Sequence, residues 1–260
     1  MSRARGLVLQ ERDKHLMREL ATMRVIDREQ AKVVAQFRST TRANARLLAL
    51  VRAGALRRFF LGATAAHSRS LYCLSQLGAQ LADVPYRGLR RKSNESLAAD
   101  FFVRHQLWVN ELYVALKYGK TPQGVEFRRW LPFFEPITPA LPLIPDGYVE
   151  LETRSRVVAS FIEVDLGNES LSVWRKKIDN YLELADSGDF EKRFRQSAFR
   201  TLVLAVTDRR LASLRKTVAA VTEKVFWFAN LEAVRQHGFF GPIWTRPEVD
   251  GQQSFLPELS

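Results

Sequence analysis

Apolar residues over the first 54 positions recur every three or four residues, a spacing that predicts short helices. One helix is predicted over residues 7–23. A second is predicted over residues 29–37, because Asp27 and Gln30 form a capping-box pattern at its start. The third helix is predicted to open at the run Ser39, Thr40 and Thr41.

Two short segments rich in aromatic and aliphatic residues follow, over residues 56–61 and 70–74, and a tip of small residues separates them. They predict a β-hairpin. Three short helices followed by a hairpin are the element order of a winged helix-turn-helix, whose third helix enters the major groove of DNA. We therefore assign residues 1–82 to such a domain.

The apolar periodicity stops between residues 83 and 95, where Pro85, Gly88 and a basic run interrupt it. This segment is predicted to be a linker, and residues 96–260 a second domain. There the pattern predicts helices and strands in alternation, with the strand over residues 201–206 almost wholly apolar, as in a sheet buried on both faces. The expected fold class is α+β with a mixed central sheet. The predicted helices are residues 96–118, 171–185 and one beginning at Asp208, and the other strands are residues 125–134, 148–152, 157–166 and 225–228.

Positive charge is concentrated in the first part of the chain. The formal net charge of the 260 residues is +12, and residues 1–100 contribute 19 Lys and Arg against 8 Asp and Glu. Such a field attracts a polyanion, and double-stranded DNA is the expected partner. A solvated basic surface is the alternative, and an anionic membrane is disfavoured because no helix combines a basic face with a broad aromatic one.

The predicted DNA contacts lie at the start of the third helix and on the hairpin. Polar side chains early in a recognition helix reach bases or phosphates, and basic side chains on a wing reach phosphates or the minor groove. The candidates are Arg38, Ser39, Thr40, Thr41, Arg42, Asn44 and Arg46 on the helix, and Arg57, Arg58 and Arg69 on the hairpin.

Other classes of protein are excluded by composition. One cysteine permits no internal disulfide and no Cys-rich zinc site, and no two of the four histidines have HxxxH spacing. No apolar run approaches the roughly 20 residues that cross a bilayer, and the N-terminal apolar stretch is too short for a secretory signal. We expect a cytoplasmic, bacterial protein.

Three carboxylates resist the burial pattern of the second domain. Glu163 and Asp165 lie on the same face of one predicted strand, and Asp146 begins the strand before it. Their mutual repulsion would be relieved by Mg²⁺ or Mn²⁺, which prefers carboxylate oxygens and activates water. Asp146 and Glu163 are the expected metal ligands, with Lys177 on the next helix orienting water or stabilising charge. Alternatively, the acids face solvent or pair with lysine.

Together, the motifs from Ile144 to Gly147, from Phe161 to Glu169 and from Lys177 to Tyr181 resemble the replication-relaxation family of bacterial plasmids and mobile elements. The resemblance implies a winged helix joined to a domain similar to the PD-(D/E)xK nuclease core. In that core Asp146 matches the family aspartate and Glu163 the D/E position. The first helix often supplies an acid, a role that the resemblance gives to Glu111.

This sequence departs from the nuclease pattern at position 165, where Asp165 replaces the expected lysine. Lysine migrates to the neighbouring helix in some branches of the superfamily, which nominates Lys177. Two alternatives follow: an Mg²⁺-dependent endonuclease or nickase, or an inactive domain serving DNA binding or assembly in a transcription regulator. The resemblance also implies action in replication or transfer, with proteins of the same element or a second copy of the chain as partners.

Overall fold

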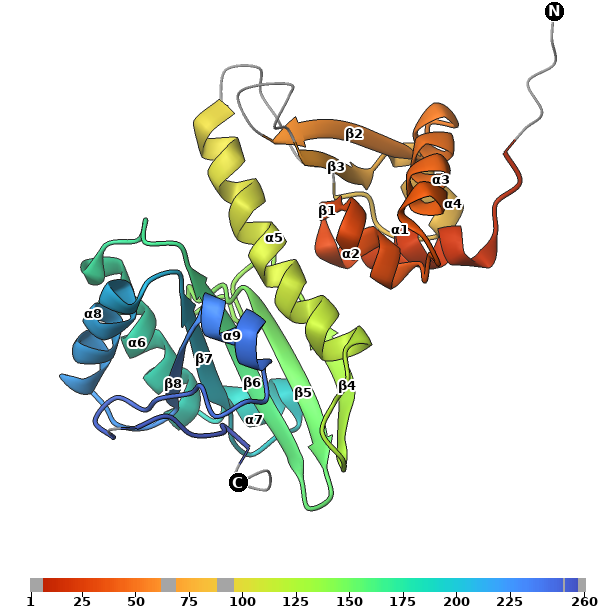
Figure 1. Ribbon diagram of the computed structural model, residues 1–260. Helices are drawn as coiled ribbons and strands as arrows, with labels where there is room; N and C mark the ends of the chain where they lie inside the picture. Colours follow the sequence, from red (N-terminus) through yellow and green to blue (C-terminus); the bar gives the residue numbers. More distant parts are fainter. Residues whose placement is uncertain (1–6, 62–68, 88–95, 250, 257–260) are drawn as a thin grey trace, which may run out of the picture. The chain divides into compact units, whose positions relative to one another are not determined.

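The computed structural model describes residues 7–61, 69–87, 96–249 and 251–256 (Figure 1). Contacts between Cα atoms divide the chain into two compact units, Met1–Val114 and Ala115–Ser260. None of the helices in these described ranges has the length and apolar character needed to cross a membrane.

The N-terminal unit contains the element order expected of a winged helix-turn-helix. Its three-stranded antiparallel sheet has the order β1-β3-β2. Strand β1 and helix α4 were not expected, and the predicted small-residue tip lies outside the described residues. The elements are α1 (Glu11–Met23), β1 (Ile26–Asp27), α2 (Arg28–Val34), α3 (Thr40–Arg52), β2 (Leu56–Leu61), β3 (Arg69–Leu74) and α4 (Gln76–Ala82).

Local caps define the helices of this unit as predicted. The Asp27 carboxylate accepts the backbone N–H of Gln30 at 2.7 Å, and the Gln30 side-chain oxygen accepts the backbone N–H of Asp27 at 3.4 Å. The Ser39 hydroxyl accepts the backbone N–H of Arg42 at 3.3 Å, which starts α3. Helix α2 ends at Val34, earlier than predicted, and the backbone turns left-handed at Gln36 (φ 52°).

The domain boundary lies further along the chain than predicted. Helix α5 (Ser96–Tyr118) has the predicted bounds, but the two units divide within it, after Val114. Its first part packs on the N-terminal unit, because the Asn110 side chain donates to the backbone carbonyls of Met23 and Val25. The Tyr113 hydroxyl also donates to the buried carboxylate of Glu19 at 2.5 Å. The assignment of residues 96–114 to the second domain is therefore corrected, since apolar spacing does not reveal which partner a helix packs against.

The second unit is a mixed α+β domain, which confirms the predicted fold class. Its sheet has the order β4-β5-β6-β7-β8, antiparallel from β4 to β6 and parallel from β6 to β8. Helices α7 and α9 were not predicted. The elements are β4 (Val125–Leu131), β5 (Gly147–Thr153), β6 (Val157–Asp165), α6 (Leu171–Asp186), α7 (Asp189–Phe194), β7 (Arg200–Ala205), α8 (Asp208–Ala219), β8 (Phe226–Asn230) and α9 (Leu231–His237).

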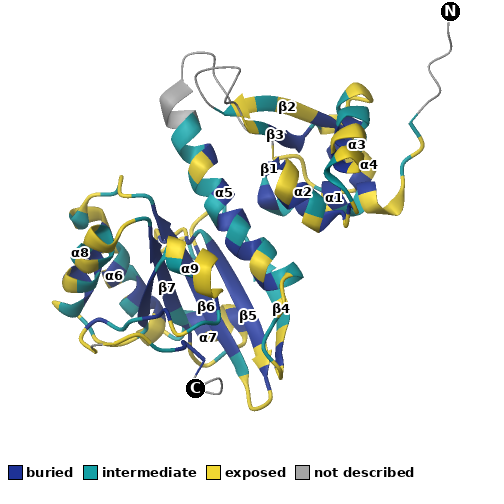
Figure 2. Ribbon diagram, in the orientation of Figure 1, coloured by how far each residue is buried: buried dark blue, intermediate teal, exposed yellow. Residues whose placement is uncertain are grey.

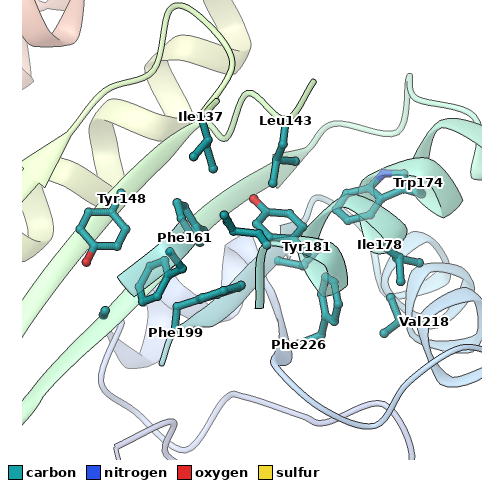
Figure 3. Close-up of a cluster of buried hydrophobic side chains, with 14 of the residues drawn as sticks. Ile137, Leu143, Tyr148, Phe161, Trp174, Ile178, Tyr181, Phe199, Val218 and Phe226 are labelled. Carbon is teal, nitrogen blue, oxygen red and sulfur yellow. The ribbon is translucent and has the colours of Figure 1, made fainter. Parts of the chain in front are cut away.

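Aromatic side chains dominate the core between this sheet and α6. Strands β5, β6 and β7 are buried along most of their length (Figure 2). Phe161 of β6 packs against Tyr148 and Tyr181, with ring centroids 5.2 and 5.6 Å apart (Figure 3). Trp174 and Ile178 extend the same cluster along α6. This packing positions α6 over the face of β6 that carries the predicted carboxylates.

Candidate active site and nucleic-acid interface

Asp146 is attached to β6 at the point where β5 begins. Its backbone N–H donates to the carbonyl of Ile162 at 3.1 Å, and its carboxylate accepts the backbone N–H of Val164 at 2.7 Å. The backbone bond continues the pairing of β5 with β6 by one residue, and the side-chain bond holds the carboxylate against β6. The Asp146 carboxylate is consequently held beside the C-terminal end of β6.

Glycine is required directly after Asp146. A Cβ atom on Gly147 would lie 2.1 Å from Cζ2 of Trp130, a ring atom on the neighbouring strand β4. Because no other residue lacks this atom, Gly147 allows β5 to pass close beneath the indole ring. The Pro145-Asp146-Gly147 sequence thus combines a candidate ligand with a steric requirement of the sheet.

Glu163 is buried and bound by two side chains of α6. Its Oε1 accepts the hydroxyl proton of Tyr181 at 2.6 Å, and its Oε2 lies 2.9 Å from the ammonium of Lys177. Lys177 and Tyr181 are four residues apart, so they share one face of the helix. The structure therefore joins Glu163 to the lysine that sequence reasoning nominated.

Burial sets the protonation behaviour of Glu163. It raises the pKa of the carboxyl to about 7; the charge of Lys177 opposes the rise, whereas that of Asp146 adds to it. Burial also raises the pKa of the Tyr181 hydroxyl, as does the neighbouring Glu163 carboxylate. Tyr181 accordingly stays protonated and donates to Glu163 across the physiological range.

Lys177 contacts a second carboxylate as well. Its ammonium lies 2.9 Å from Oε2 of Glu169, in the loop between β6 and α6. Burial by itself lowers the pKa of Lys177, but the carboxylates around it raise the value above that of a free lysine. The lysine is therefore charged and bridges a buried and a partly exposed carboxylate.

Asp165 has a different environment, and its expected catalytic role stays a prediction. Arg210 binds both of its oxygens at 2.8 Å, and the Trp174 indole donates to Oδ2 at 2.6 Å. Burial raises the pKa of Asp165, but the hydrogen bonds from Arg210 and Trp174 outweigh it and lower the pKa below the ordinary value. Through these bonds Asp165 joins β6 to α6 and α8.

The donor set fits a divalent cation of the Mg²⁺ type, which takes oxygen ligands and commonly one or two carboxylates with water. Asp146 and Glu163 supply two such groups. Over the described ranges, no group of three or more His, Cys, Asp or Glu side chains is arranged to hold a metal ion. The repulsion that suggested a metal is already reduced by two cations, Lys177 on Glu163 and Arg210 on Asp165.

Glu111 lies on the part of α5 that belongs to the N-terminal unit, whereas Asp146 and Glu163 belong to the second. The acidic role that the resemblance gives to Glu111 stays a prediction.

The start of α3 presents polar side chains to solvent. Arg38, Thr41 and Arg42 are exposed, and Thr40 is half-buried. Neither Arg38 nor Arg42 forms an ion pair within the described ranges. Asn44 is exposed too and lines a cavity of about 210 Å³ between α2, α3 and β3. On β2, Arg57 and Arg58 are exposed, and Arg58 lies over the Phe60 ring at 5.2 Å.

Three of the predicted DNA contacts have partners within the N-terminal unit. Arg46 binds both oxygens of buried Asp13 on α1. Arg69 pairs with the Asp27 carboxylate that caps α2. Ser39 is the cap of α3. Their assignment to DNA stays a prediction. The sequence did not reveal the buried acids that lie 33 positions from Arg46 and 42 positions from Arg69.

Sequence reasoning did not identify Arg210 or Glu169 as parts of the carboxylate cluster. Arg210 lies 45 residues after its partner Asp165, in the first turn of α8. No spacing pattern signals that pairing. Glu169 stands within the motif from Phe161 to Glu169, and a glutamate so close to the start of α6 was the available signal.

Most of the chain is similar to one known protein family. The model of the replication-relaxation family matches residues 17–196. The chain belongs to the replication-relaxation family. The match includes the cluster formed by Asp146, Glu163 and Lys177, and it ends before β7 and Arg210. The resemblance stated from the motifs is confirmed.

Other comparisons add little to the family assignment. No curated protein matches this replication-relaxation sequence. Among solved structures, restriction endonuclease FokI is similar at 8% identity and a TM-score of 0.31, over 88% of this chain and 44% of that chain. The chain spans less than half the length of that structure, and a TM-score of this size supports no statement about a shared activity.

Proposed function

We propose that this replication-relaxation protein binds double-stranded DNA and acts in the replication or transfer of a bacterial plasmid or mobile element, or in their regulation. The observation that carries the proposal is the exposed pair Arg38 and Arg42 at the start of α3. They stand at the position where a winged helix-turn-helix contacts the major groove. Arg57 and Arg58 on the hairpin supply further phosphate contacts.

Electrostatics support this assignment. Most of the excess positive charge of the chain lies in its first 100 residues. A protein that neutralises about four phosphates releases their counterions, so its affinity falls roughly a hundredfold between 50 and 200 mM salt. A purely structural basic surface would show no such dependence.

Fluorescence anisotropy with labelled duplex DNA tests the proposal. The double variant Arg38→Ala/Arg42→Ala is expected to weaken binding at least tenfold and to reduce the salt slope by about two. The matched control is Arg209→Ala/Lys216→Ala, which removes the same charge from the exposed face of α8. Equal losses in both variants, or an affinity that salt does not change, would contradict the proposal.

Phosphodiester cleavage is the second candidate function, and the contact between Lys177 and Glu163 beside Asp146 favours it. In this proposal Asp146 and Glu163 hold Mg²⁺ or Mn²⁺, which would polarise a phosphate and lower the pKa of a bound water. Lys177 carries a positive charge at the position where charge develops on the phosphate. Tyr181 holds the Glu163 carboxylate in one orientation.

Nicking of supercoiled plasmid in Mg²⁺ or Mn²⁺ separates cleavage from binding alone. Asp146→Ala and Lys177→Met are expected to lose nicking a hundredfold or more while keeping DNA affinity. Glu183→Gln, on an exposed position of α6, serves as the control with full activity. Equal nicking by the wild type and Asp146→Ala would overturn this site, and binding without any nicking would favour the regulator with an inactive domain.

A further inference from the structure

Lys177 has two carboxylate partners that differ in their freedom to move. The Glu163 side chain is 1% exposed and is also held by the Tyr181 hydroxyl. The Glu169 side chain is 33% exposed and lies in the loop before α6. Moving Glu163 away from Lys177 would leave a buried carboxylate with one partner fewer, which is costly. Moving Glu169 away exposes its carboxylate to water, which costs little.

The loop that carries Glu169 is fixed through its backbone. Arg210 donates to the Glu169 carbonyl oxygen at 2.6 Å, and the same guanidinium binds Asp165. Gly167 donates its backbone N–H to Asp165 at 2.7 Å in a left-handed conformation (φ 87°). The position of the Glu169 main chain is therefore set by β6 and α8, while its side chain can rotate toward solvent.

We infer that Glu169 is the displaceable counter-ion of Lys177, and that an incoming phosphate group replaces it. In the resting protein the ammonium pairs with the partly exposed carboxylate of Glu169 as well as with the buried carboxylate of Glu163. A phosphodiester that takes this place receives the lysine's charge-assisted hydrogen bond, and Glu163 keeps its own. Glu169 is thus a gating residue that sets the affinity of the pocket for phosphate. The inference rests on the proposed cleavage function, for which Lys177 is the phosphate-facing cation.

Competition at one ammonium has a measurable consequence. A carboxylate that pairs with Lys177 weakens phosphate binding by the free energy of the ion pair that phosphate has to replace. For a partly exposed ion pair this corresponds to roughly fivefold in the dissociation constant. Replacing Glu169 with glutamine retains the shape of the side chain and removes its charge. The variant should therefore bind phosphate more tightly than the wild type.

Inorganic phosphate is the probe. The melting temperature of the protein is measured at increasing phosphate concentration, with ionic strength held constant and chloride as the reference anion. Phosphate that binds the folded state stabilises it by RT ln(1 + c/Kd), where c is the free phosphate concentration, so at one phosphate concentration a tighter-binding variant shows a larger rise in melting temperature. Glu169→Gln is expected to bind phosphate roughly fivefold more tightly. The control Asp179→Asn removes one negative charge from an exposed position two residues from Lys177, and no ion pair joins that position to the lysine in the described ranges. It should change affinity less than twofold.

A third variant tests whether a gain in phosphate affinity depends on Lys177. Glu169→Gln combined with Lys177→Met should lose the tighter binding. An equal gain in Asp179→Asn, no gain in Glu169→Gln, or a gain that survives the loss of Lys177 would each overturn the inference. The probe contains no DNA, so failure here leaves DNA binding by the N-terminal unit intact. Conversely, a chain that neither binds nor nicks DNA would still show the phosphate response of Lys177.

Discussion

Glu163 and Asp165 stand two residues apart on the same face of β6, yet their pKa values are displaced in opposite directions. Glu163 is buried against the ammonium of Lys177, and its pKa is raised to about 7. Asp165 is bound through both oxygens by Arg210, and its pKa is lowered. Asp165 receives two hydrogen bonds from Arg210 and others from the Trp174 indole and the Gly167 backbone, which together outweigh its burial, whereas the like charge of Asp146 adds to the effect of burial on Glu163. The two acids should therefore respond differently to pH.

Stability should decrease as pH rises through the range in which Glu163 titrates. The folded state keeps the Glu163 proton up to about pH 7, whereas the unfolded chain releases it near the ordinary value of 4.5. The folded state therefore binds more protons in this window, and the free energy of unfolding falls by up to about 3 kcal/mol as pH rises. Glu163→Gln should remove this decline in urea denaturation between pH 4.5 and 7.5. If Glu163→Gln showed the same decline as the wild type, the prediction would be wrong. Glu183→Gln is the control and should retain the decline.

Asp165 should contribute stability with the opposite sign. Its folded pKa is lowered, so its contribution is present above the pKa of the unfolded chain, near pH 4, and is lost as pH falls through the folded value. Asp165→Asn leaves Arg210 without its charged partner and should cost about 3 kcal/mol at pH 7. The difference from the wild type, measured by denaturation, should shrink below about pH 4. If the stability difference between the wild type and Asp165→Asn were the same at all pH values, the ion pair of Asp165 with Arg210 would not be its cause.

Arg42 and Arg46 stand one helical turn apart on α3 and should have separable roles. Arg46→Ala leaves the buried Asp13 carboxylate without its cation and should destabilise the N-terminal unit by about 3 kcal/mol. Arg42→Ala removes an exposed side chain and should change the free energy of unfolding by less than about 0.5 kcal/mol. DNA affinity should fall in Arg42→Ala. If Arg42→Ala destabilised the fold as much as Arg46→Ala, this division would be wrong.

Gly147 should tolerate no side chain while Trp130 is present. Gly147→Ala places a methyl group within 2.1 Å of the indole ring and should cost about 1–3 kcal/mol through overpacking. Trp130→Leu in the same chain should recover part of that loss, since the two positions share one contact. Thermal unfolding of the two single variants and the double variant measures the coupling. Strictly additive effects would exclude the contact as the reason for the glycine.

Several elements could be predicted because their signals are local. Helix α5 has the predicted bounds, and α3, the hairpin strands and the succession of strands along the second unit also agree with the sequence. Capping by Asp27 and Ser39 acts within three residues, and the alternation that places Glu163 with Asp165 acts within two. The short helices α4, α7 and α9 escaped prediction, since six or seven residues carry too little periodicity.

The sequence by itself determined the α+β class, the concentration of positive charge, and the presence of Asp146, Glu163 and Lys177 in one chain segment, because each depends on near neighbours or on composition. Tertiary structure alone decided which charged side chains form ion pairs within the protein. It paired Arg46 with Asp13, Arg69 with Asp27 and Arg210 with Asp165, and it assigned the first part of α5 to the N-terminal unit. The physical reason is that an ion pair depends on distance in space and on burial, and neither is encoded in the spacing of residues along the chain.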